Sequence, residues 1–321
     1  MFQNNLLMAA DAATSGTSLV SVGNSALYVD GNSEFLVRTL TGAGTSRKTF
    51  TLGGWFYKTK VGSGSDCRIF QWDNGTTNTD RGMIPSIPVF KFFLNNEEIT
   101  AWTKGTDTIA QDDVFTIVDS GARQAWGSAP EGSGYFDGYM AECFLLDGQV
   151  VTDATDFVDV SADGLYVTPK SNAAMKALTF GDEGFYLDNV TNAQTDASGN
   201  GNNFTNTNTV TLSTNTPTNM LATFNPLINL ASASTNVLSN GNNTVSSNSN
   251  SYFTNAQTTL AFTSGKYIYA ITPDAAAVDK GNGPLLTEAR GNYPNDGNSP
   301  NWVGFICSGP TGSSTPAILM Y

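Results

Sequence analysis

Turn-forming dipeptides divide this chain into short segments, and that punctuation limits what it can fold into. Asp-Gly and Asn-Gly pairs recur between runs of β-branched and aromatic residues, for example at positions 30, 74, 137, 147, 163, 200 and 296. Such pairs accept positive φ angles and close tight turns. Many short strands separated by tight turns predict an all-β sandwich fold.

The expected strands alternate apolar and polar residues, as strands with one buried face do. They are Ala26–Asp30, Phe50–Lys58, Cys67–Trp72, Val89–Asn95, Asp113–Val118, Tyr135–Leu146, Gly184–Asp188, Lys266–Ile271 and Trp302–Ile306. Helical periodicity is confined to Leu6–Ala13 and Asn172–Ala177.

Charged residues are scarce and mainly acidic. They make up 13% of the chain, about half the usual share, and the formal net charge is −13. An acidic surface disfavours a nucleic-acid partner or an anionic membrane, since both bind basic faces. No run of 18 apolar residues occurs, so we expect no membrane insertion.

The chain contains no histidine at all. Ser-His-Asp and Cys-His catalysis, His-ligated zinc and two-His-one-carboxylate iron are therefore excluded. Cys67, Cys143 and Cys307 have no metal-binding or disulfide-framework spacing. These absences predict a protein that is not an enzyme and that needs no resident cofactor.

Composition changes after Asp188. Asn, Ser and Thr supply 42 of the 72 residues from Asn189 to Leu260, and Asp196 is the only charge there. So few apolar side chains cannot fill a core, which predicts an extended connector or strands laid on neighbouring protein surface. An amyloid-like polar tract is the alternative. The strand pattern returns after Leu260, over about sixty residues, which is enough for part of a domain.

The N-terminal segment is apolar but lacks a basic region, because the first basic residue is Arg38. We therefore expect no secretory signal, and we expect synthesis in a cytoplasm. Exposed apolar segments are often interaction sites. A docking role for residues 1–18 would rest on Phe2, Leu6, Leu7 and Met8, and a frayed terminus is the alternative.

Three stretches resemble laminin-G/concanavalin-A-like lectin modules of bacteriophage tail-fibre and virion proteins, particularly those of marine phages. They are SALYVDGNSEFLVRTLTGAGTSRKTFTLGGWFYK (25–58), VFKFFLNNEEIT (89–100) and GYFDGYMAECFLLDGQVVTDATDF (134–157). Residues 184–208 and 215–227 resemble the connector that follows the lectin module in such proteins. TSGKYIYAIT (263–272) is similar to the first strand of a SPRY-type sandwich.

After the apolar docking segment (1–18), the resemblance implies a concanavalin-A-like jelly-roll lectin domain (19–188), a connector (189–260) and a partial SPRY-like β-sandwich (261–321). It also implies a non-enzymatic structural protein of the virion, namely a tail fibre, spike or head-decoration subunit. Such a protein would be made in the host cytoplasm, assemble with other virion proteins and attach to a host-surface glycan. The polar tract and the half-length terminal sandwich leave strands that need partners, so we also expect a homo-oligomer, a trimer, with Asn189–Leu260 buried between subunits. The alternatives are a carbohydrate-active enzyme subunit of glycoside-hydrolase type and a secreted adhesin.

Candidate site residues are few. Trp102 and Trp126 lie in Gly/Thr/Ser-rich contexts and are the expected carbohydrate contacts. Asp196, Ser198 and Asn200 have the alternate spacing of calcium ligands, although position twelve of that loop is Thr207 rather than Glu. A glycine-rich turn is the alternative to calcium.

Glu142 is expected to be structural. Simple alternation places it on the same strand face as Met140 and Phe144. Catalysis would need a second carboxylate at glycosidase distance on that face.

Overall fold

The structure is a computed structural model, which describes part of the chain and divides it into two units. The described residues are 25–59, 67–75, 93–94, 96–99, 115–151, 153–162, 167–218, 223–229, 236–239, 241–247, 256–258, 280–282, 303–307 and 317–320. The first unit holds the described residues up to Thr223 together with Ser239–Asn242. The second unit holds Phe224–Leu238 and the residues from Asn243 onward.

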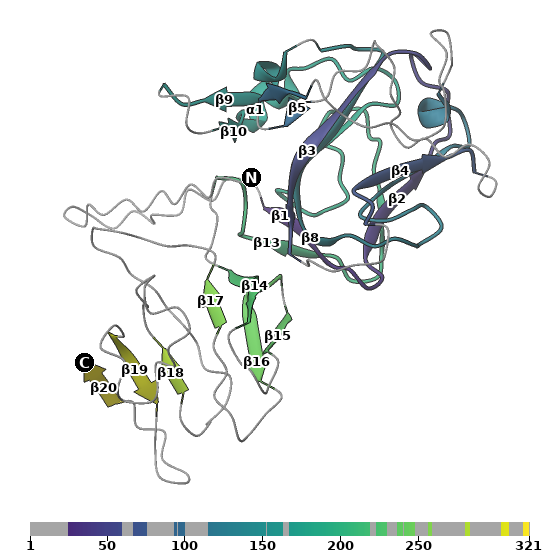
Figure 1. The fold of residues 1–321 in the computed structure, drawn as a ribbon. Helices are drawn as coiled ribbons and strands as arrows, with labels where there is room; N and C mark the ends of the chain where they lie inside the picture. The colour runs from purple at the N-terminus through teal and green to yellow at the C-terminus, as the bar shows by residue number, and fades with distance from the viewer. Residues whose placement is uncertain are drawn as a thin grey trace. The chain divides into compact units, whose positions relative to one another are not determined.

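The first sheet of the first unit is built around one long strand, β8 (Figure 1). β3 pairs along one side of β8, while β1 and β11 pair with its two halves on the other side, and β13 pairs with β1. All pairings are antiparallel. The bounds are β1 Ala26–Asp30, β3 Phe50–Lys58, β8 Asp137–Asp147, β11 Phe185–Leu187 and β13 Thr211–Ser213.

The second sheet of the first unit has the order β12-β2-β7-β4 and is also antiparallel. Its bounds are β2 Phe35–Thr39, β4 Phe70–Asp73, β7 Arg123–Trp126 and β12 Thr205–Thr207. Smaller elements are β5 Phe93–Leu94, β6 Glu97–Glu98 and the 3₁₀ turn η1 Thr116–Val118.

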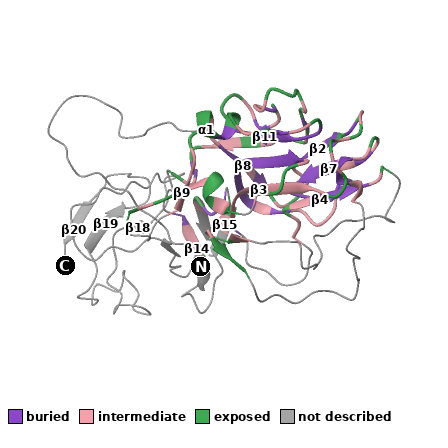
Figure 2. Ribbon diagram, turned by 90° about the horizontal axis from the view of Figure 1, so that it is seen from above, coloured by how far each residue is buried: buried purple, intermediate pink, exposed green. Residues whose placement is uncertain are grey.

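Side chains from both sheets meet in one apolar core, which makes the first unit a β-sandwich. Leu27, Met140 and Leu145 of the first sheet pack in the same cluster as Trp72 and Trp126 of the second. Figure 2 shows this burial running along β8, β2 and β7. The all-β fold class expected from the sequence is therefore confirmed.

The other face of the first sheet is partly covered by the segment that follows β8. Phe144 and Tyr186 pack there with Met175 of the short helix α1, and this forms a second apolar cluster. The elements of this segment are η2 Ala154–Asp156, β9 Val158–Val160, β10 Val167–Pro169 and α1 Asn172–Lys176. The Ser171 side chain caps α1 by accepting the backbone N–H of Ala174.

A β-bulge interrupts β8 at Glu142, whose φ is +53°. Gly53 pairs with Phe144 whereas Trp55 pairs with Ala141, so the register shifts by one residue between them. As a result Met140 and Cys143 both reach the inner core, while Phe144 lies in the outer cluster. The expectation that Met140 and Phe144 share a face is therefore wrong, because an extra residue reverses the alternation.

The Asn/Ser/Thr-rich tract begins inside the first sandwich rather than after it. β12 pairs with β2, and β13 pairs with β1, so each sheet gains a strand from beyond residue 188. The sandwich thus extends past the boundary expected at residue 188. The interpretation of the tract as strands laid on neighbouring surface holds for these two strands.

The second unit is also β-structured in its described residues. β14 pairs with β17, β15 with β16, and β19 lies between β18 and β20. The bounds are β14 Phe224–Asn229, β15 Asn236–Ser239, β16 Thr244–Ser247, β17 Ala256–Thr258, β18 Lys280–Asn282, β19 Val303–Cys307 and β20 Ala317–Met320. A SPRY-like arrangement stays a prediction, and Lys266–Ile271 lies outside the described residues.

Candidate functional site

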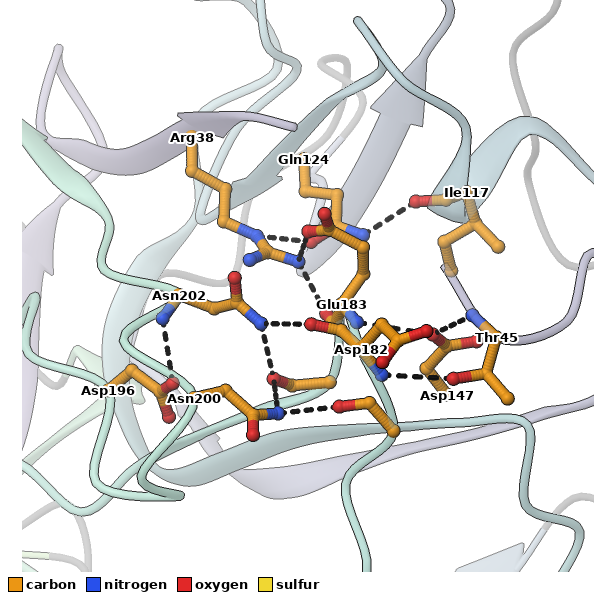
Figure 3. A network of polar contacts seen from close by, with 12 residues as sticks. Arg38, Thr45, Ile117, Gln124, Asp147, Asp182, Glu183, Asp196, Asn200 and Asn202 are labelled. Atoms are coloured by element: carbon orange, nitrogen blue, oxygen red, sulfur yellow. Dashed lines mark hydrogen bonds and ion pairs between the residues drawn. The ribbon is translucent and has the colours of Figure 1, made fainter. Parts of the chain in front are cut away.

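Arg38 lies in a buried polar network that joins several loops and strands of the first unit (Figure 3). Its Nε donates to Gln124 Oε1 at 2.8 Å, and one terminal nitrogen donates to the Glu183 carbonyl at 2.5 Å. Gln124 in turn donates to the Ile117 carbonyl at 2.6 Å. The guanidinium also lies over the Phe185 ring, 5.1 Å from its centroid. This arginine therefore holds β2, β7 and the loop before β11 together.

The ion pair in this network is shielded from water. The Arg38 guanidinium lies 3.4 Å from the Glu183 carboxylate, and both side chains are less than one-tenth exposed. Burial lowers the pKa of Arg38 to about 10, against the opposing effect of Glu183. Burial likewise raises the pKa of Glu183, although Arg38 opposes the shift. Each group thus stabilises the charged form of the other against the effect of burial.

Asp147, the last residue of β8, gathers two loops with one carboxylate. Its Oδ2 accepts the backbone N–H groups of Thr45 at 2.5 Å and Glu183 at 3.2 Å, while Oδ1 accepts that of Ser46 at 3.0 Å. The side chain is completely buried. A Cβ on Gly44 would lie 2.6 Å from Oδ2, so glycine permits this close approach. The carboxylate is a structural acceptor here.

The loop predicted as a calcium site is closed by its own hydrogen bonds. Asp196 Oδ1 accepts from the Tyr186 and Ser198 backbone N–H groups, and Oδ2 accepts from the Ser198 hydroxyl and the Asn202 N–H, all at 2.8–2.9 Å. The Asn200 amide donates to the carbonyls of Gly181 and Gly184. Four donors already surround the Asp196 carboxylate, so this geometry favours the glycine-rich turn.

Glu142 is held at the bulge by a buried tyrosine. The Tyr186 hydroxyl donates to Glu142 Oε2 and also contacts Asn172 Oδ1 at 3.2 Å. Burial, followed by the Glu142 charge, raises the pKa of Tyr186 far above its ordinary value. Tyr186 therefore stays protonated and serves as a permanent donor to the carboxylate.

Of the two predicted carbohydrate contacts, Trp126 is buried and Trp102 is not among the described residues. Trp126 is 1% exposed and packs between Phe56 and Phe70 in the core, so the expectation of an exposed loop residue is wrong. The cause is β7, which ends at Trp126 and lies between β2 and β4 in the second sheet. Trp102 lies outside the described residues, as do Phe2, Leu6, Leu7 and Met8.

The outer face of the first sheet carries a row of three tyrosines that sequence reasoning did not single out. Tyr28, Tyr139 and Tyr57 lie opposite one another on β1, β8 and β3. The ring centroids of Tyr28 and Tyr139 are 5.1 Å apart, and those of Tyr139 and Tyr57 are 6.0 Å apart. Trp55 packs beside them. We call Tyr28, Tyr139 and Tyr57 the tyrosine row.

The buried position of Arg38 could have been predicted from the sequence. Arg38 follows Leu36 by two positions and so belongs on the core face of its strand, where a charged residue requires a buried partner. The tyrosine row carries no comparable signal, because its members come from three strands whose register is set only by the fold.

In the described part of the chain, no group of three or more His, Cys, Asp or Glu residues could hold a metal ion. The buried carboxylates of Asp147, Glu183, Asp196 and Glu142 are each engaged by donors of the protein itself. Such an arrangement fixes the loops and strands that carry these donors.

Comparison with known proteins found no matching family model, and searches of characterised proteins and solved structures likewise returned no match. The class that the fold defines is an all-β protein whose first unit is a two-sheet sandwich. Within the described residues, no helix has the length and apolar character needed to cross a membrane.

Proposed function

We propose that this chain is a non-catalytic structural protein of a bacteriophage virion, a tail fibre, spike or head-decoration subunit, that attaches to a host-surface glycan. The proposal combines the resemblance of residues 25–58 and 134–157 to phage lectin modules with the two-sheet sandwich. A concanavalin-A-like jelly roll and a homotrimeric assembly belong to the same proposal. The described sandwich is compatible with the lectin-like part of it.

The observation that carries the non-catalytic part is the state of the buried carboxylates. Glycoside hydrolysis needs two carboxyl groups free to exchange protons or attack the sugar. Glu142 accepts from Tyr186, and Asp147 accepts three backbone N–H groups. Groups held this way serve the fold, which supports recognition without chemistry.

The test measures binding and hydrolysis on the same samples. Full-length protein should bind immobilised host envelope polysaccharide saturably, and it should release no reducing ends from that polysaccharide, laminarin or alginate. Reducing-end release abolished by Glu142→Gln would contradict the non-enzyme proposal. Absence of binding to the host polysaccharide would contradict attachment through a glycan.

The predicted sugar contact that remains proposed is Trp102. Trp102→Ala should weaken polysaccharide binding about tenfold, which corresponds to about 1.4 kcal/mol of binding free energy. The melting temperature should stay unchanged if Trp102 serves binding alone. A lower melting temperature with unchanged binding would place Trp102 in the fold instead.

A further inference from the structure

The Asn200–Gly201 pair lies in the loop first predicted as a calcium site. Asn200 Nδ2 donates to the Gly181 carbonyl at 2.6 Å and to the Gly184 carbonyl at 3.0 Å (Figure 3). The Asn200 amide is therefore a double donor that joins this loop to the segment before β11. We call Asp196–Asn203 the Asp196 loop.

Asparagine followed by glycine is prone to deamidation, because glycine has no side chain to shield its nitrogen and adopts many backbone conformations. In this reaction the Gly201 nitrogen loses its proton and bonds to Cγ of Asn200. The Cγ–Nδ2 bond then breaks, and Nδ2 leaves as ammonia. Water opens the resulting cyclic imide and gives aspartate or isoaspartate at position 200, so the overall change consumes water and releases ammonia.

Two features of the folded loop act on this reaction in opposite directions. Gly201 is exposed, and no atom lies within 4 Å of the place that a Cβ on it would take, so its surroundings do not shield it. The Asn200 amide, by contrast, is held by two carbonyls. Cleavage of the Cγ–Nδ2 bond removes the donor of both hydrogen bonds. Deamidation in the closed loop therefore costs both interactions, whereas deamidation in an open loop costs neither.

The acid product does not fit the closed loop. A carboxylate at position 200 would direct negative oxygens at the carbonyl oxygens of Gly181 and Gly184. Gly184 is buried, so its carbonyl loses one of two donors without gaining solvent, and only the Asn202 amide at 2.8 Å remains. The Asp196 carboxylate in the same loop adds repulsion between like charges.

From these observations we infer that Asn200 is a deamidation site controlled by closure of the Asp196 loop. The closed loop keeps the Asn200 amide on the Gly181 and Gly184 carbonyls and suppresses the reaction. A chain that stays open reacts, and the acid that forms opposes closure. Deamidation thus marks irreversibly those chains in which the loop has remained open.

The first measurement compares the folded and the unfolded chain. Full-length protein is kept in mildly alkaline buffer with and without guanidinium chloride, and peptides containing Asn200 are then analysed by mass spectrometry. Deamidation of Asn200 should be about tenfold slower in the folded protein, because the reaction there costs two hydrogen bonds. In denaturant, Asn200 should react as fast as the Asn-Gly pairs at positions 74 and 240, which serve as internal references.

Ser198→Ala loosens the loop without changing the reactive pair. Ser198 Oγ accepts the Asn200 N–H at 3.2 Å and donates to Asp196 Oδ2 at 2.8 Å. Its removal should therefore raise the rate of Asn200 deamidation in the folded protein. Thr195→Ala, a change at an exposed position of the neighbouring segment, is the control and should leave that rate unchanged.

Asn200→Asp supplies the product directly and should lower the urea midpoint of unfolding. Asn192→Asp is the matched control, because the Asn192 side chain acts as an acceptor instead of a donor. Its Oδ1 accepts the backbone N–H groups of Gln194 at 3.1 Å and Thr195 at 2.8 Å, and a carboxylate keeps both bonds. The urea midpoint of Asn192→Asp should therefore match that of the native protein.

Three results would overturn the inference. The first is deamidation of Asn200 at equal rates in folded and unfolded protein, and the second is no deamidation of Asn200 in guanidinium chloride. The third is a urea midpoint of Asn200→Asp equal to that of the native protein. None of these measurements involves a glycan, so their outcome leaves the proposed attachment function untouched.

Discussion

At the scale of single residues, Glu142 determines how β8 presents its two faces. Its positive φ inserts one extra residue, which turns Cys143 and Leu145 toward the core and Phe144 and Leu146 toward the outer cluster. A non-glycine residue held in this region is strained unless its surroundings fix it. The Tyr186 hydroxyl supplies one such contact.

Tyr186→Phe tests that contact. Removing the hydroxyl takes a donor from a buried carboxylate, so we expect the free energy of unfolding to fall by about 2 kcal/mol. Urea denaturation followed by tryptophan fluorescence measures the change. Tyr135→Phe is the matched control: its hydroxyl donates to the neutral Gly132 carbonyl at 2.7 Å, and its loss should cost about 1 kcal/mol. A loss of unfolding free energy in Tyr186→Phe that is no larger than in Tyr135→Phe would contradict a special role for the hydrogen bond to Glu142.

Tyr28 gives the fold an alkaline pH dependence. Burial raises the pKa of this phenol from 10.0 to about 12, while the Gly241 N–H acts in the opposite direction. A raised pKa stabilises the folded state below pH 10, and that stabilisation is lost as the pH rises toward 12. The free energy of unfolding should therefore fall more steeply between pH 10 and 12 in the native protein than in Tyr28→Phe. Denaturation curves with parallel pH dependence would contradict this expectation.

At the scale of elements, the end of β8 shows how one carboxylate fixes loops. Asp147→Asn replaces an acceptor oxygen with an amide group that faces backbone donors. We expect the free energy of unfolding to fall by about 2–3 kcal/mol. Asp182→Asn, an exposed change in one of the same loops, should stay within about 0.5 kcal/mol. Hydrogen exchange should localise the difference to the N–H groups of Thr45, Ser46 and Glu183, and protection retained there would contradict the assignment.

The elements also show which structures could be predicted from the sequence. β1 and β3 have the bounds expected from alternation, and α1 begins at the expected Asn172. β2 and β7 were not expected: β2 carries a charge on its core face, and β7 adjoins glycine-rich sequence. In the described part of the strand expected at Asp113–Val118, Thr116–Val118 form a 3₁₀ turn.

The candidate site was harder to predict than the fold. Alternation within a strand identifies a face, but it cannot show which strands become neighbours. The Arg38–Glu183 pair joins residues 145 positions apart, and the tyrosine row depends on the pairing of three strands. Trp126 was misplaced for the same reason, since its burial comes from the sheet that β7 completes.

At the scale of the whole molecule, the Asn/Ser/Thr-rich tract stabilises the first sandwich mainly through hydrogen bonds, because it has few apolar side chains to bury. The Asp196 loop is its clearest case, because the Asn200 and Asn202 amides bind the carbonyls before β11. We therefore expect the loop to keep its structure without a bound ion.

Calcium removal tests that expectation. EDTA should leave the melting temperature unchanged, and millimolar calcium should not raise it. If the loop bound calcium, a free calcium concentration of 100 times the Kd would add about 2.7 kcal/mol to the free energy of unfolding. Asp196→Asn should lower the melting temperature equally with and without calcium, and a difference between the two would restore the calcium hypothesis.

The pairing of β13 with β1 has a consequence for how the protein is made. Ser213, the partner of Ala26, is synthesised 187 residues after it, and Thr205, the partner of Val37, is synthesised 168 residues after it. At 5–20 residues per second, the first strands spend about ten seconds or more without these partners. The nascent chain therefore carries incomplete sheets until the asparagine-rich tract emerges, and in that interval chaperones have the longest access to it.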